Sequence, residues 1–252
     1  MNKPILLSVL LLSFAVMSGC ATTKNPDGTV NVDPYEKTNR SIYNFNDTLD
    51  RNIMRPVAEG YRKITPEPVR DSVTNFFDNL KYLNVMLNSF LQGKFNNGVS
   101  DTVRFVVNST VGIGGLFDMA TPVGLEEHQE DFGQTLAVWG VGQGAYLNLP
   151  FAGPNTSGNV PDYGSSYVTN PLSYVGGLFL FPVALLNAVN SRANLLDASE
   201  FVDEAALDPY TFTREAYLQH RAFLIHDGNL PESSEDDLFD VDMDDESLLI
   251  ID

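Results

Sequence analysis

Cysteine and basic residues are scarce in this 252-residue chain. Cys20 is the only cysteine, so the chain can form no internal disulfide bond and must draw its stability from packing. Lys and Arg number 15 against 33 Asp and Glu, which gives a formal net charge of -18. A chain of this sign repels the phosphates of nucleic acids. We therefore expect no nucleic acid partner.

The sequence also lacks the signatures of common catalytic centres. It holds three histidines but no H-E-x-x-H pair, no G-x-S-x-G turn and no G-x-x-x-x-G-K phosphate loop. Residues 140–144 (GVGQG) echo a dinucleotide loop, yet no strand pattern precedes them. Asp240, Asp242, Asp244 and Glu246 are spaced for loose calcium binding, without the glycine of an EF-hand loop. We predict no enzymatic activity, no metal site and no cofactor.

An apolar segment near the start of the chain ends just before Cys20. Residues 5–17 are mostly apolar and follow Lys3. This length suits the core of a signal peptide and is shorter than the roughly 20 residues of a membrane-spanning helix. The pattern predicts a lipoprotein signal peptide at residues 1–19.

The residues around the predicted cleavage site point to lipidation. Residues 17–20 (MSGC) resemble the bacterial lipobox, in which the cysteine is acylated and becomes the first residue of the mature chain. We predict lipidation of Cys20, followed by a linker at residues 20–32. Ala21, rather than Asp, behind the cysteine indicates an outer-membrane address. The alternative is an ordinary secreted protein with one stray cysteine.

Negative charge is concentrated at the other end of the chain. Residues 227–252 hold 11 acidic side chains and no Lys or Arg. This composition predicts an acidic disordered tail at residues 229–252, behind a single domain at residues 33–228. The tail either keeps the protein soluble or docks to a basic partner through residues 248–251 and their acidic flank.

A long segment of the predicted domain has almost no charge. Residues 132–191 contain a single charged side chain, Asp162. Because a surface needs charge to remain in water, this segment is either buried or faces a membrane. The densest apolar part, residues 178–189, is broken by Pro182. We predict a membrane-facing surface, with the core of a soluble domain as the alternative; the predicted side chains are Trp139, Leu178, Phe179, Phe181, Leu185 and Leu186.

Helical patterns dominate the domain, and strand-type alternation is almost absent. Asp33 as an N-cap, Pro34 and Glu36 predict the start of a helix of about twenty residues. Glycine and proline in residues 140–165 predict a loop or a hairpin. The other predicted helices cover residues 69–91, with a possible break at Tyr82, and residues 99–109, 132–139, 178–190, 192–207 and 209–225. We predict an all-α fold with irregular Gly/Pro-rich loops.

Polar side chains interrupt the apolar faces of two predicted helices. Asn39 and Asn46 lie on the apolar stripe of the first helix, where their amides either tie two helices together or line a polar passage. Arg214 and Arg221 share a face of the last helix with Tyr210 and other apolar residues. They either contact a lipid phosphate or form salt bridges with the chain's own carboxylates.

Six blocks of sequence, in this order, are similar to the VacJ/MlaA family of outer-membrane lipoproteins. They are DPYEKTNRSIYNFND, RPVAEGYR, FVVNSTVGIGGLFD, EDFGQTLAVWGVGQGAY, LNLPFAGP and DPYTFTREAYLQHR. The resemblance covers about residues 33–228. It implies a ring-like bundle of amphipathic helices embedded in the inner leaflet of the outer membrane, with a polar channel through its middle.

The resemblance also implies a function and partners. Such proteins sit beside trimeric outer-membrane porins, take phospholipids that have strayed into the outer leaflet, and pass them to a soluble periplasmic lipid carrier protein. Phospholipid would be the transported ligand. The amides on the apolar stripe of the first helix make five of its residues candidates for a channel or gate: Asn39, Tyr43, Asn44, Phe45 and Asn46. The alternative is a structural membrane scaffold without transport.

Overall fold

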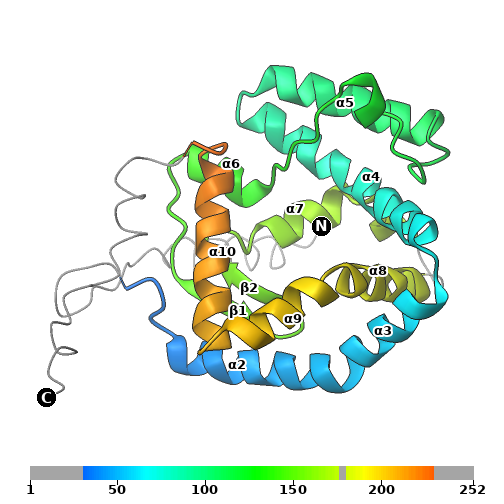
Figure 1. Ribbon diagram of the computed structural model, residues 1–252. Helices are drawn as coiled ribbons and strands as arrows, with labels where there is room; N and C mark the ends of the chain where they lie inside the picture. Colours follow the sequence, from blue (N-terminus) through cyan, green and yellow to red (C-terminus); the bar gives the residue numbers. More distant parts are fainter. Residues whose placement is uncertain (1–30, 176–179, 230–252) are drawn as a thin grey trace, which may run out of the picture.

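Helices follow one another around a ring in the computed structural model, which describes residues 31–175 and 180–229 (Figure 1). The predicted signal peptide, Cys20, Leu178, Phe179 and residues 230–252 of the predicted acidic tail lie outside the described residues. One side of the ring is a long helical segment: α2 (Glu36–Leu49), a π-helical turn η1 (Asp50–Met54) and α3 (Arg55–Ile64).

The start and the end of this segment differ from the prediction. Tyr35, not Asp33, occupies the N-cap position, and no side chain caps the helix. The carboxylate of Asp33 instead accepts hydrogen bonds from Asn39 at 2.8 Å and Tyr210 at 2.5 Å. The helix also continues beyond its predicted end. Pro56 has no N–H to donate, and in a regular α-helix its ring would clash with the carbonyl group four residues earlier. That carbonyl group belongs to the wider π-helical turn η1, which makes room for the ring.

The next two helices form an antiparallel pair on the opposite side of the ring. Helix α4 (Glu67–Leu91) runs without the predicted break at Tyr82, and α5 (Phe95–Thr110) follows after a tight turn at Gly93. A short 3-10 turn, η2 (Thr121–Val123), lies between α5 and the uncharged segment.

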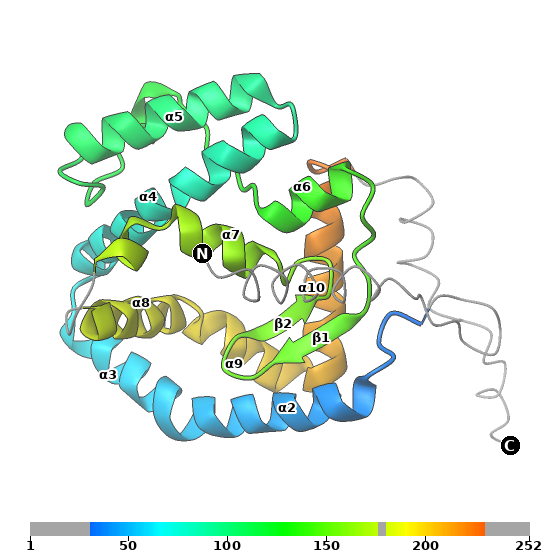
Figure 2. The same cartoon turned by 180° about the vertical axis from the view of Figure 1, so that it is seen from behind.

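The glycine- and proline-rich residues 140–165, predicted to form a loop or a hairpin, contain a hairpin. Helix α6 (Phe132–Val138) begins at Asp131, whose side chain caps Gln134 N. Strands β1 (Tyr146–Leu149) and β2 (Gly153–Thr156) pair antiparallel, with Tyr146 opposite Thr156. The pair lies against α2 and α10 inside the ring (Figure 2). Helix α7 (Asp162–Thr169) and the 3-10 turn η3 (Pro171–Tyr174) follow.

The three predicted C-terminal helices are present and close the ring. They are α8 (Leu180–Asn194), α9 (Leu196–Ala205) and α10 (Pro209–Ile225), and Asp208 caps α10 through Tyr210 N and Thr211 N. The all-α prediction is confirmed, since the sheet of the described residues has two short strands. No helix among these residues has the length and apolar character required to cross a bilayer.

The distribution of polarity is the reverse of that in most water-soluble domains. Among the described residues, nine buried side chains are apolar or aromatic and 17 are polar or charged. The apolar core cluster found in residues 31–175 and 180–229 is small and comprises Ala58, Ala193 and Leu196, with Tyr61 against it. Large apolar side chains are exposed on most elements instead. Since buried polar groups must be hydrogen-bonded, the interior is a polar network rather than an apolar core.

Candidate functional site

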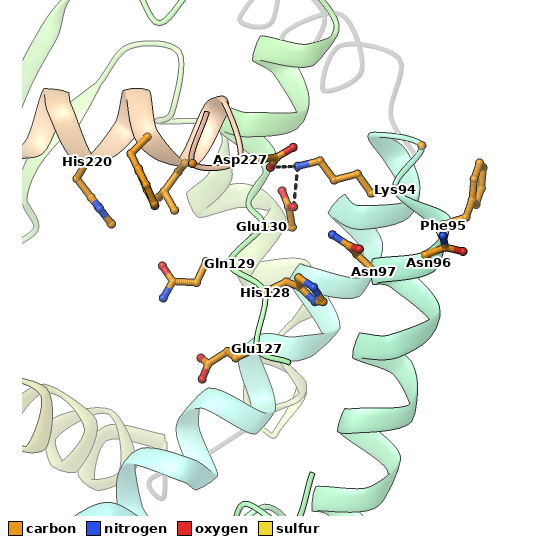
Figure 3. A pocket seen from close by; sticks show the side chains of 14 residues that line it. Lys94, Phe95, Asn96, Asn97, Glu127, His128, Gln129, Glu130, His220 and Asp227 are labelled. Carbon is orange, nitrogen blue, oxygen red and sulfur yellow. Dashed lines mark hydrogen bonds and ion pairs between the residues drawn. The ribbon is translucent and has the colours of Figure 1, made fainter. Parts of the chain in front are cut away.

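Two neighbouring cavities share one wall inside this polar region. The wall is an irregular segment between η2 and α6, residues 127–130, which we call the central connector. The inner cavity, of about 390 Å³, lies between the connector, α4 and α7. The outer cavity, of about 820 Å³, lies between the connector, the start of α5 and the end of α10 (Figure 3).

Side chains of the central connector alternate between two directions. Glu127 and Gln129 are exposed and point to the same side in Figure 3, whereas His128 and Glu130 turn toward α4 and α5. Glu130 is buried. Such alternation is the natural consequence of an extended backbone. One short segment therefore presents two polar side chains to the cavities while the other two fix it in place.

A charged cluster fixes the connector to both helical neighbours. Lys94, in the turn between α4 and α5, contacts Glu130 Oε1 at 2.8 Å and also pairs with Asp227 at the end of α10. The pKa of Lys94 is raised above its usual value. Burial by itself would lower this pKa, but the hydrogen bonds to the two carboxylates outweigh the effect of burial. Gln92 Nε2 donates to the other oxygen of Glu130 at 2.8 Å. The amine stays charged and joins three parts of the ring.

A serine, a histidine and an aspartate meet beside the connector, but not in a catalytic arrangement. His128 Nδ1 lies 2.8 Å from Asp101 Oδ1, and Ser89 Oγ donates to Asp101 Oδ2 at 3.1 Å. In a catalytic triad the histidine bridges the serine and the carboxylate. Here the serine and the histidine bind the same fully buried carboxylate, so the histidine cannot activate the serine. The cluster holds the connector against α4 and α5.

A chain of amide and hydroxyl side chains runs from α6 to the wall of the inner cavity, where Asn84 and Asp162 line it. Asn84 Nδ2 donates to Asp162 Oδ1 at 3.0 Å, and Asn84 Oδ1 accepts from Asn88 Nδ2 at 3.1 Å. Thr135 Oγ1 then donates to Asn88 Oδ1 at 2.8 Å. The single charge of residues 132–191 thus lies in the polar interior, where it also accepts from Phe132 N.

A buried arginine holds the loop that leads into the connector. Arg104 donates to the hydroxyl of Tyr82 at 2.7 Å, to Leu125 O at 2.6 Å and to Asp118 at 2.8 Å. Burial tends to raise the pKa of Asp118, but hydrogen bonds from Thr121 and others and the charge of Arg104 lower it to about 2. This ionic cluster ties the loop to α4 and α5.

Two of the three asparagines of α2, Asn39 and Asn46, bind the hairpin. Asn39 donates to Tyr146 O at 3.1 Å and accepts from Asn148 N at 2.9 Å. Asn46 donates to Leu149 O at 2.9 Å and accepts from Phe151 N at 2.9 Å. The amides were predicted either to tie two helices together or to line a polar passage. They tie α2 to another element, but this element is the hairpin and not a second helix.

None of the five candidate residues of α2 lines the inner or the outer cavity. Tyr43 and Asn46 line a separate cavity of about 630 Å³ between α2, η1, α8 and α9. Asn44 is exposed, and Phe45 packs edge-on against Phe151 with ring centroids 5.4 Å apart. Their role in a channel or gate stays a prediction. Sequence reasoning missed the central connector because it carries no helical stripe.

The two arginines of α10 form ion pairs within the chain. Arg214 Nη1 lies 3.1 Å from Asp33 Oδ2, and Arg214 also pairs with Glu215 at 2.8 Å. Arg221 is buried and pairs with Asp131, the cap of α6. Salt bridges were the alternative to headgroup contact, and these contacts account for both side chains. Contact with a lipid headgroup stays a prediction.

The described side chains predicted to face a membrane are exposed. The exposed fraction is 55% for Trp139, 73% for Phe181, 48% for Leu185 and 40% for Leu186. Leu178 and Phe179 lie outside the described residues. Exposure of large apolar side chains on several helices requires an apolar phase or a partner around the ring.

Comparisons with known proteins agree with this architecture. The family model for the MlaA lipoprotein matches residues 31–224. The intermembrane phospholipid transport system lipoprotein MlaA of Escherichia coli is 37% identical over 254 residues, covering 94% of this chain and 98% of that protein. An uncharacterized protein of Rickettsia bellii is 39% identical over 191 residues, covering 75% of each chain.

A solved structure also resembles the fold. It is described as "Structural basis for maintenance of bacterial outer membrane lipid asymmetry" and matches with a TM-score of 0.67 at 34% identity. The match covers 77% of this chain and 100% of that one.

Proposed function

The chain belongs to the MlaA lipoprotein family, and from that membership we propose that it removes misplaced phospholipids from the outer leaflet of the outer membrane and so maintains lipid asymmetry. The name of the Escherichia coli relative, an intermembrane phospholipid transport system lipoprotein, supports this role. The structural match to a protein described in terms of outer-membrane lipid asymmetry supports the same role.

The observation that carries the proposal is the inverted polarity of the ring. A phospholipid headgroup cannot cross hydrocarbon cheaply because its charges lose their water. A polar interior lets the headgroup keep hydrogen-bonding partners, while an apolar exterior keeps the protein in the leaflet. Buried amides and carboxylates inside, with exposed Trp139, Phe181 and Leu185 outside, supply both surfaces.

We place the headgroup route along the central connector. The inner and the outer cavity share this segment, and both are lined by charged and amide side chains. The sequence has no nucleotide-binding loop, so the protein itself moves lipid passively and a carrier must take the lipid away. The residues of α2, including Asn46 and Phe45, would then influence the gate indirectly through the hairpin that they contact.

The location and the partners follow from the same proposal. Acyl chains on Cys20 anchor the protein on the periplasmic side of the outer membrane, since each buried methylene contributes about 0.8 kcal/mol. The exposed apolar side chains lie in the inner leaflet. A trimeric porin lies beside the ring, and a soluble periplasmic carrier protein receives the lipid.

Disruption of the gene tests the proposal. We expect phospholipid to accumulate on the cell surface, measured by labelling headgroups on intact cells, and we expect wild-type protein but not Cys20→Ala to restore the normal level. A structural scaffold would leave surface phospholipid unchanged, and a phospholipase would show lost lysophospholipid. In the same cells, unchanged surface phospholipid with both Asn46→Leu and a deletion of Phe45 would contradict a gating role for α2.

A further inference from the structure

The inner cavity carries an excess of negative charge. One cation, Lys81, and five carboxylates line it, and the carboxylates are those of Asp78, Glu127, Glu130, Asp131 and Asp162. The outer cavity adds Asp227 and Lys94. Because the walls are protein and not water, these charges act on any headgroup that enters more strongly than exposed charges would.

Three of the five carboxylates have close cationic partners. Asp78 pairs with Lys81 at 2.7 Å, and Glu130 pairs with Lys94. Arg221 neutralises the third, Asp131, from behind the wall. Their charges are largely compensated, so they contribute little to the field inside the cavity.

The other two carboxylates lack a cation of their own. Asp162 is held by neutral donors, namely the amide of Asn84, the hydroxyl of Ser166 and the backbone N–H of Phe132. Glu127 is 54% exposed and lies 3.9 Å from Arg104, whose closer partner at 2.8 Å is Asp118. These two residues leave the inner cavity net negative.

An independent feature of the same cavity is an acceptor without a donor. Gln134 lines the inner cavity and is 1% exposed. Its Nε2 donates to Gln129 O at 2.9 Å, but its Oε1 has no hydrogen-bond partner within the described part of the chain. A buried acceptor without a donor costs about 1–3 kcal/mol. A ligand that brings N–H groups would satisfy it.

We propose that the inner cavity favours zwitterionic phospholipids with a primary amine in the headgroup over anionic phospholipids. The ammonium group would donate a hydrogen bond to Gln134 Oε1. Its positive charge would balance the carboxylates of Glu127 and Asp162. The phosphate of the same headgroup would have to share Lys81, the one cation of the lining, with Asp78. An anionic headgroup brings the phosphate charge alone into a negative cavity. This inference rests on the proposed function and names the class of lipid that the route prefers.

Glu127 offers the sharpest test, and we expect the fold to tolerate its neutralisation because its contact with Arg104 is long, at 3.9 Å. No hydrogen bond links its side chain to another described residue, and it is exposed to the cavity. The neighbouring Glu126 is also exposed and does not line either cavity. Glu127→Gln and Glu126→Gln therefore remove the same charge at adjacent positions, one facing the cavity and one not. Asp162 is unsuitable, since it binds the backbone of α6.

The experiment titrates the full-length lipidated protein in neutral detergent with phosphatidylethanolamine or phosphatidylglycerol that carries the same fluorescent acyl chain. We expect the wild type to bind phosphatidylethanolamine about fivefold more tightly at low ionic strength, and salt to reduce this ratio. Glu127→Gln should lower the ratio to about twofold, chiefly by tighter binding of phosphatidylglycerol, and Glu126→Gln should leave it unchanged.

The outcomes separate this inference from the function on which it rests. Equal binding of the two lipids, a preference for phosphatidylglycerol, or an equal effect of both variants would overturn the headgroup preference while leaving lipid transport in place. Binding of neither lipid would overturn the preference, and together with unchanged surface phospholipid in gene-disrupted cells it would overturn the proposed function too.

Discussion

Polar groups are buried on both sides of the ring, but they are used differently. Where the hairpin meets α2, neutral amides bind backbone groups, and each amide is matched by donors and acceptors of the strands. Around the central connector, charged side chains bind one another and border cavities. Burial of a polar residue is therefore not evidence of a lipid route by itself. The surplus charge distinguishes the connector side, since buried groups without a hydrogen-bond partner occur on both sides, as Gln134 Oε1 and Asn148 Nδ2 show.

Substitution of Arg104, near the central connector, should lower the free energy of unfolding more than any substitution where the hairpin meets α2. Arg104→Met removes the donor to Tyr82, Leu125 O and Asp118, and it leaves the partly buried carboxylate of Asp118 without its cation. We expect a loss of about 3–5 kcal/mol in the free energy of unfolding. Denaturant unfolding of the purified protein, followed by circular dichroism, measures it.

Arg62→Met is the matched control for Arg104→Met. Arg62 pairs with Asp197, whose side chain is largely exposed, so the same substitution should cost less than about 1 kcal/mol. If both variants lost equal stability, the ionic cluster would not anchor the loop that leads to the connector, and the contrast between the two sides would lose its main support.

A smaller effect is expected where the hairpin meets α2. Asn39→Leu leaves Tyr146 O, Asn148 N and the carboxylate of Asp33 without their amide partner. We expect a loss of about 2–3 kcal/mol in the free energy of unfolding, measured in the same way. The same substitution at the exposed Asn44 of that helix should change stability by less than about 0.5 kcal/mol. Equal losses at the two positions would show that the hairpin contacts contribute nothing to stability.

Local patterns predicted the elements of this fold better than their contacts. Helices, the hairpin and the exposed apolar surface followed from periodicity, from glycine and proline and from the missing charge. Asp33 has the sequence of an N-cap, but its carboxylate binds Tyr210, which is 177 positions away, and no local pattern shows such a contact. The central connector was missed because residues 127–130 are all polar, so alternation between buried and exposed positions left no mark in the sequence.

Acid should weaken the ionic cluster more than the neutral amides. Hydrogen bonds from Thr121 and the charge of Arg104 hold the pKa of Asp118 at about 2, although burial acts in the opposite direction. A carboxyl whose pKa is lower in the folded state than in the unfolded state stabilises the fold above the unfolded pKa of 3.8. That contribution is lost as the pH falls toward 2.

Asp118→Asn should therefore cost about 1 kcal/mol of the free energy of unfolding at neutral pH, after allowance for solvent screening, and the difference from wild type should shrink between pH 4 and pH 2. Denaturant unfolding at a series of pH values measures this difference. Asp71→Asn, which removes the same charge from an exposed position of α4, should show no such convergence. A difference that stays constant down to pH 2 would mean that Asp118 stabilises the loop through hydrogen bonds that its neutral amide replaces equally well.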